Sequence, residues 1–132
     1  MHEIADGGRV VRFTVLVVDD NDVAQRLCQK VLEKAGYGVL MAGDGLEAVD
    51  MALKRLPSMI LMDVAMPGID GLEAMRRIKA ELPGMPIVIA SAHSMDSDRE
   101  RYLAAGADDV LSKPFRLTDL ISMVGKVVEA SR

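Results

Sequence analysis

The sequence predicts an α/β fold in which five parallel strands form one doubly wound sheet with helices on both faces. Short apolar runs alternate five times with segments of helical periodicity along the chain. The apolar runs are nearly continuous, without a polar residue at every second position. Such strands are typical of a parallel sheet that helices cover on both sides.

The strands are predicted from five short runs rich in Val, Ile, Leu and Met, which have the length and composition of buried strands. In chain order they cover residues 14–18, 37–42, 59–62, 86–91 and 109–112.

Each strand is followed by apolar residues spaced at i, i+3, i+4 and i+7, the pattern of a helix with one buried face. The predicted helices cover residues 23–35, 46–56, 72–82, 95–105 and 117–128. Gly36 and Gly106 are placed as C-terminal caps, and Pro57 and Pro83 stop two other helices.

Composition limits the class of protein. The 132 residues are enough for one core, and we assign 1–13 to a leader, 14–129 to the domain and 130–132 to a tail. A net charge of −4 without a basic run argues against nucleic acid as the partner. The single Cys28 cannot form an internal disulfide, and no apolar run could span a membrane. We expect a cytoplasmic protein.

Polar residues occur where several of the predicted strands end. Asp19 and Asp20 follow the first strand, Asp63 the third, Ser91 ends the fourth, and Lys113 follows the fifth. Each could be an ordinary solvated loop residue. Because parallel strands end at the same edge of a sheet, however, all five are expected to lie together at its carboxyl edge.

This set of groups suits phosphoryl chemistry. Three carboxylates repel one another, and a hard divalent cation such as Mg²⁺ relieves that repulsion. An ammonium group and a hydroxyl can hold phosphoryl oxygens, while a carboxylate can act as the nucleophile and form an acyl phosphate.

Four segments together resemble the receiver domains of two-component response regulators. They are VLVVDDN (15–21), ILMDVAMPGIDG (60–71), IVIASA (87–92) and GADDVLSKPF (106–115). The resemblance covers about residues 14 to 129 with the motifs in the expected order. It implies a flavodoxin-like (βα)5 fold with strand order 2-1-3-4-5.

The resemblance also implies a role for each site residue. Asp63 would be the phosphoacceptor. Mg²⁺, with Mn²⁺ as a substitute, would be bound by Asp20, Asp63 and the backbone carbonyl of Ala65, and by Asp19 through water. Ser91, Ala92 and Lys113 would bind the phosphoryl group, and the peptide bond between Lys113 and Pro114 would be cis.

Two departures from the family pattern concern the output and the lifetime of the phosphorylated state. Many receivers have Tyr or Phe three residues before the Lys, and here that position is Val110. An aromatic switch at this position is therefore excluded. Ala65 and His93 occupy the positions that tune hydrolysis of the acyl phosphate.

The partners implied are a histidine kinase or a histidine phosphotransfer protein, and a downstream protein. The downstream protein would bind the face made by the fourth helix, fifth strand and fifth helix, with no direct contact to nucleic acid or membrane. Residues Arg99, Tyr102, Lys113, Arg116 and Lys126 are candidates for that face. With no output domain expected, the chain would be either a stand-alone regulator or the receiver of a hybrid kinase.

The resemblance implies a switch that catalyses its own phosphorylation and dephosphorylation and is not an enzyme acting on other substrates. A magnesium-dependent phosphatase of the haloacid dehalogenase type is the alternative, but it needs an acid two residues after the nucleophile, where Ala65 stands. A Rossmann-type nucleotide site needs a Gly-rich turn after the first strand, and this sequence has Asp-Asp-Asn there instead. A receiver that acts independently of phosphorylation remains a second alternative.

Overall fold

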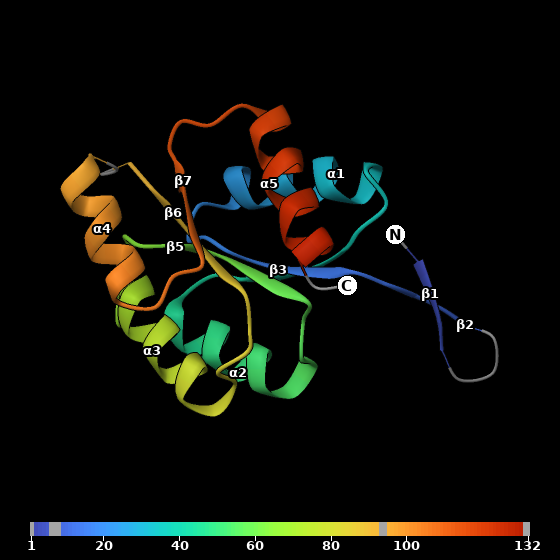
Figure 1. Cartoon of the computed structure of the whole chain (residues 1–132), viewed down its shortest axis with the longest axis horizontal. Helices are drawn as coiled ribbons and strands as arrows, with labels where there is room; N and C mark the ends of the chain where they lie inside the picture. Colours follow the sequence, from blue (N-terminus) through green and yellow to red (C-terminus); the bar gives the residue numbers. More distant parts are fainter. Residues whose placement is uncertain (1, 6–8, 93–94, 131–132) are drawn as a thin grey trace.

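The computed structural model describes residues 2–5, 9–92 and 95–130. Its main sheet is built from β3 (Thr14–Val18), β4 (Gly38–Ala42), β5 (Met59–Asp63), β6 (Ile87–Ser91) and β7 (Asp109–Ser112). All neighbouring pairs are parallel, and the order is β4-β3-β5-β6-β7 (Figure 1). Counted along the chain this is 2-1-3-4-5, which confirms the predicted doubly wound α/β fold and its flavodoxin-like strand order.

Helices cover both faces of this sheet (Figure 1). Helices α1 (Asp22–Lys34) and α5 (Leu117–Ala130) lie on one face, and α2 (Gly45–Arg55), α3 (Gly71–Glu81) and α4 (Asp96–Ala104) lie on the other. None of the described helices is long and apolar enough to cross a membrane.

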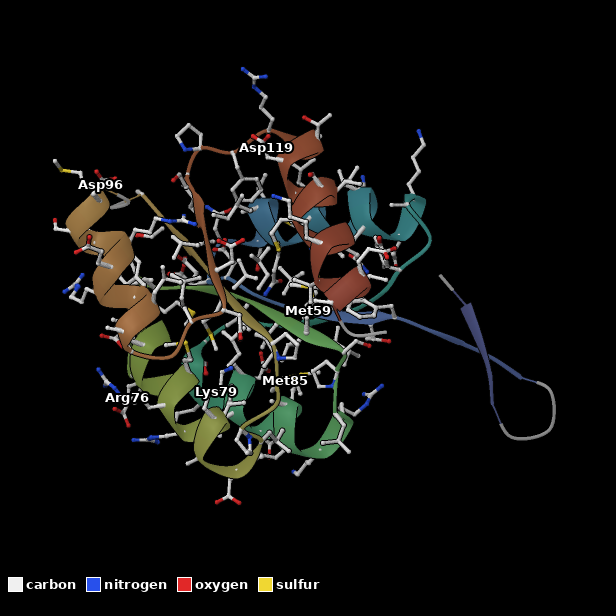
Figure 2. All side chains as sticks on the ribbon, viewed as in Figure 1. Met59, Arg76, Lys79, Met85, Asp96 and Asp119 are labelled. Atoms are coloured by element: carbon white, nitrogen blue, oxygen red, sulfur yellow. The ribbon has the colours of Figure 1, made fainter. Side chains whose placement is uncertain are left out.

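Two separate hydrophobic clusters form the core because alternate strand residues face opposite sides of the sheet. Leu16, Ile60 and Ile89 pack with α2, α3 and α4, whereas Val17 and Leu61 pack with α1 and α5. Figure 2 shows side chains filling the space on both sides of the strands.

Helix boundaries agree with the prediction to within one or two residues, and local capping explains them. Asn21, Asp44 and Asp70 each accept a hydrogen bond from a backbone N–H in the first turn of α1, α2 and α3. Gly36 and Gly106 follow α1 and α4 with φ of +100° and +120°, as expected of C-terminal caps.

The segment 1–13, which we assigned to a leader, contains a two-stranded hairpin that we did not predict. Strands β1 (His2–Ala5) and β2 (Arg9–Arg12) pair antiparallel and do not join the main sheet. The hairpin projects beyond the start of β3 (Figure 1). Adjacent β-branched residues in the sequence RVVR favour an extended backbone there.

Candidate functional site

Three carboxylates gather at the carboxyl edge of the sheet. Asp19 and Asp20 directly follow β3, and Asp63 is the last residue of the neighbouring strand β5. Carboxylate oxygens of the three residues lie within 4.8 Å of one another. Asp19 and Asp63 are buried, at 9% and 8% exposure, while Asp20 is exposed. The arrangement offers hard oxygen donors at a partly open site, which suits a divalent cation that keeps some of its water.

Lys113 reaches the same site from the loop after β7. Its Nζ lies 3.2 Å from Asp19 Oδ2 and 3.4 Å from Asp63 Oδ1. Burial alone would lower the pKa of Lys113, but the two carboxylates outweigh it and raise the pKa above its ordinary value. Lys113 is therefore a fixed positive charge beside Asp63.

Asp63 is a carboxyl group in an unfavourable environment for its ionised form. Burial raises its pKa, and the neighbouring Asp19 raises it further. Lys113 and a hydrogen bond from the backbone of Ala65 act in the opposite direction without cancelling the increase. The site thus has an excess of negative charge that one ammonium group does not balance.

Asp19 also has a structural role that sequence reasoning did not identify. Its Oδ1 accepts the backbone N–H of Asn21, and its Oδ2 accepts a hydrogen bond from Lys113. The side chain of Gln25, on α1, donates from Nε2 to the carbonyl oxygens of Asp19 and Ala42. These bonds fix the ends of β3 and β4. Apart from its position in the predicted first helix, nothing in the sequence indicated that Gln25 would make these bonds.

Ser91 ends β6 and is buried, at 3% exposure. Its Oγ lies 3.0 Å from the hydroxyl oxygen of Tyr102, a residue of α4. We named Tyr102 as a candidate for the partner face, but its side chain is 1% exposed and cannot contact a partner there. Val110 is buried in the same hydrophobic cluster as Tyr102.

Other predicted site residues lie in the surrounding loops. Ala65 and Ala92 are exposed residues just beyond β5 and β6. The peptide bond between Lys113 and Pro114, which the resemblance implies to be cis, is cis in the structure. His93 lies outside the described residues.

The predicted partner face contains a hollow of about 440 Å³ beside β7 and α5. Arg99, Leu111 and Lys126 are among its lining residues. Arg116 is exposed in the loop before α5. The cationic candidates other than Lys113 thus lie on or near this face.

Comparison with known proteins assigns the family. The family model of the response regulator receiver domain matches residues 15–125. Response regulator MprA of Mycobacterium avium is 36% identical over 118 residues, which are 89% of this chain and 52% of that protein. The chain spans about half the length of the curated relatives it matches.

Solved structures agree with this assignment. The receiver domain of a Francisella response regulator superposes with a TM-score of 0.86 at 28% identity, covering 90% of this chain and 98% of that one. Vibrio cholerae chemotaxis protein CheY4 superposes with a TM-score of 0.84 at 29% identity, covering 89% and 99%. With a matching family model over most of its length, this chain belongs to the receiver domains of two-component response regulators.

Proposed function

We propose that Asp63 accepts a phosphoryl group from a phosphohistidine and that the phosphorylated domain signals by contact with another protein. The observation that carries the proposal is the cluster of three carboxylates with the Lys113 ammonium 3.4 Å from Asp63 Oδ1. The phosphohistidine would belong to a histidine kinase or a histidine phosphotransfer protein, since members of this family interact with such proteins.

The donor set at this site fits Mg²⁺. When bound, the ion would neutralise charge on the carboxylates and on the oxygens of the incoming phosphoryl group. Both oxygens of Asp19 already accept hydrogen bonds, from Asn21 and Lys113. These bonds support contact through water for Asp19. As the family resemblance implies, direct binding would come from Asp20, Asp63 and the carbonyl of Ala65. Mn²⁺ has the same preference for oxygen ligands.

The protein's own groups would then act as follows. A carboxylate oxygen of Asp63 forms a bond to phosphorus while the bond from phosphorus to the histidine nitrogen breaks, and the imidazole keeps the bonding electron pair. Lys113 and the Ser91 hydroxyl, with Ala92 beside them, hold the phosphoryl oxygens. Attack by water later returns the free carboxylate and inorganic phosphate.

This cycle modifies the protein itself, so we propose that it is not an enzyme acting on an external substrate. The downstream partner would bind the face formed by α4, β7 and α5, where the hollow lined by Arg99 and Lys126 lies. We also propose a cytoplasmic location, which the free thiol of Cys28 supports.

The test uses a small phosphodonor such as acetyl phosphate with Mg²⁺ and intact-mass measurement. We expect one added phosphoryl group in the wild type and none in Asp63→Asn. Asp50→Asn is the matched control, because Asp50 is an exposed acid on α2 paired with Lys54. An unchanged wild-type mass, with Mg²⁺ binding confirmed separately, would contradict the proposal. Repeated turnover of an aryl phosphate would instead favour the phosphatase alternative.

A further inference from the structure

We propose that Tyr102 couples the position of the Ser91 side chain to the position of helix α4. The residue at position 110 cannot do this in this chain, because it is Val and has no aromatic ring. The inference rests on the proposed phosphorylation of Asp63. It starts from one contact, the 3.0 Å separation between Ser91 Oγ and the hydroxyl oxygen of Tyr102. Both side chains are buried, at 3% and 1% exposure.

Ser91 ends β6 at the same edge of the sheet as the acidic cluster, and its hydroxyl contacts α4. Asp63 pairs with Ala90 across β5 and β6, so Ser91 is the next residue along the neighbouring strand. Successive strand residues face opposite sides, and Ile87, Ile89 and Ser91 therefore share one face. Ile89 belongs to the hydrophobic cluster that contains Tyr102. The Ser91 hydroxyl is thus positioned at the end of the sheet on the α4 side.

Two side chains of helix α4, Tyr102 and Arg99, link it to the sheet. Tyr102 is its buried residue, and Figure 2 shows Asp96 at its outer, N-terminal end. Arg99 makes a second link, donating to the carbonyl oxygen of Val110 and to the Asp109 carboxylate. The residue before the helix, Met95, provides no side-chain cap. A displacement of Tyr102 would therefore act directly on the position of α4.

The hydrogen bond constrains what happens when Ser91 turns toward a phosphoryl group. A serine hydroxyl has one proton to donate, and that proton would go to a phosphoryl oxygen. Tyr102 must then be the donor to Ser91 Oγ, and its ring must follow the movement of Ser91. If the ring stayed in place, the buried tyrosine hydroxyl would lose its bond to Ser91, which is unfavourable. Tyr102 follows Ser91, and α4 moves with it.

Val110 makes room for this arrangement. It is the much smaller side chain in the same cluster, on the strand next to Ser91. The large buried ring comes from α4 in this chain, not from β7. A downstream protein bound to α4 would in turn alter the equilibrium of phosphorylation at Asp63, because coupling between two sites is reciprocal.

The composition of the chain permits a direct test, because it has two tyrosines and no tryptophan. In Tyr37→Phe, Tyr102 is the sole tyrosine. Tyr37 belongs to the opposite hydrophobic cluster, edge-on to Phe13 with ring centroids 6.0 Å apart. We would record near-ultraviolet absorbance and tyrosine fluorescence of this variant before and after acetyl phosphate and Mg²⁺, with intact mass measured on the same samples.

We expect the Tyr102 signal to change with phosphorylation and to stay constant when Asp63→Asn is added. The matched control is Tyr102→Phe, in which only Tyr37 reports and no change is expected. Hydrogen exchange of the α4 amides should change several-fold on phosphorylation when Tyr102 is present. It should change much less in Tyr102→Phe, although that variant still gains the phosphoryl group.

The two proposals fail in different ways. A gain in mass without any change in the Tyr102 signal overturns the role of Tyr102 and leaves the phosphorylation of Asp63 intact. An equal response of α4 in Tyr102→Phe also overturns the role of Tyr102. If no phosphoryl group is added, the proposed function fails and the inference fails with it.

Discussion

Asp63 is a carboxyl group that the fold keeps partly dehydrated beside two other acids and one ammonium group. Its pKa is raised in the folded protein, first by burial and then by Asp19. The folded state therefore binds the proton more tightly than the unfolded chain does. Stability associated with this group is fully present in acid and is lost as the pH rises through the raised pKa.

We expect Asp63→Asn to stabilise the domain at neutral pH without divalent cations, because Asn stays uncharged. Lys113 keeps Asp19 as a partner at 3.2 Å. The gain should be on the order of 1 kcal/mol, a few degrees in Tm, and should disappear as the pH falls below the ordinary range for Asp. Urea unfolding at several pH values measures it. Asp50→Asn should show no comparable gain, and a less stable Asp63→Asn protein at neutral pH would contradict the expectation.

Cys28 allows a second prediction at the scale of one residue. It is buried on α1, and burial raises the pKa of its thiol, with the Asp19 carboxylate acting in the same direction. A raised pKa means less thiolate at neutral pH, and thiolate is the reactive form. We expect alkylation by iodoacetamide to be much slower in the native protein than in denaturant. Because the chain has a single Cys, intact mass reports this residue alone. Equal rates would show that Cys28 is accessible.

At the scale of elements, the start of α3 packs closely against the end of β5. Gly71 is the first residue of α3, and its backbone N–H bonds to the carbonyl oxygen of Val64. A Cβ at position 71 would overlap the carbonyl oxygen of Asp63. Only glycine permits the helix to approach the strand so closely.

We therefore expect Gly71→Ala to destabilise the domain by roughly 1–3 kcal/mol, the usual cost of forced overpacking. It should also slow phosphorylation, because Asp63 would have to shift. Gly84→Ala is the control, since a Cβ there meets no atom within 4 Å. Thermal unfolding and the rate of mass gain with acetyl phosphate measure the two effects. If both variants matched the wild type, the close packing of α3 on β5 would be disproved.

Elements with strong local signals were predicted well, and elements without them were not. Continuous apolar runs and the glycines at positions 36 and 106 placed strands and helix ends close to those observed. The first strand of the hairpin, HEIA, is too short and polar to stand out. Helix α4, with the sequence DSDRERYLA, has no clear apolar face, so periodicity could not assign the side on which Tyr102 lies.

For the whole molecule, the predicted convergence of acids and Lys113 followed from topology. Parallel strands end at one edge, so residues distant in sequence were brought together once the strand order was known. The contact between Ser91 and Tyr102 was missed because it depends on how one helix packs across the sheet. Val110 marked the departure from the family pattern, but the sequence alone did not show which residue fills the space.

Mg²⁺ should stabilise the fold as a whole if it binds the acidic cluster. A ligand that binds only the folded state stabilises it by about 2.7 kcal/mol when present at about 100 times its Kd. We expect Mg²⁺ to raise Tm in the wild type, with the shift nearly abolished in Asp20→Ala and reduced less in Asp19→Ala. We expect this difference because both carboxylate oxygens of Asp19 already accept hydrogen bonds, from Asn21 and Lys113. The side chain of Asp20 is exposed and can bind the ion directly. Each variant is its own reference in chelator, which separates metal binding from any loss of intrinsic stability. Equal losses in the two variants would contradict the assignment of Asp20 as the direct ligand.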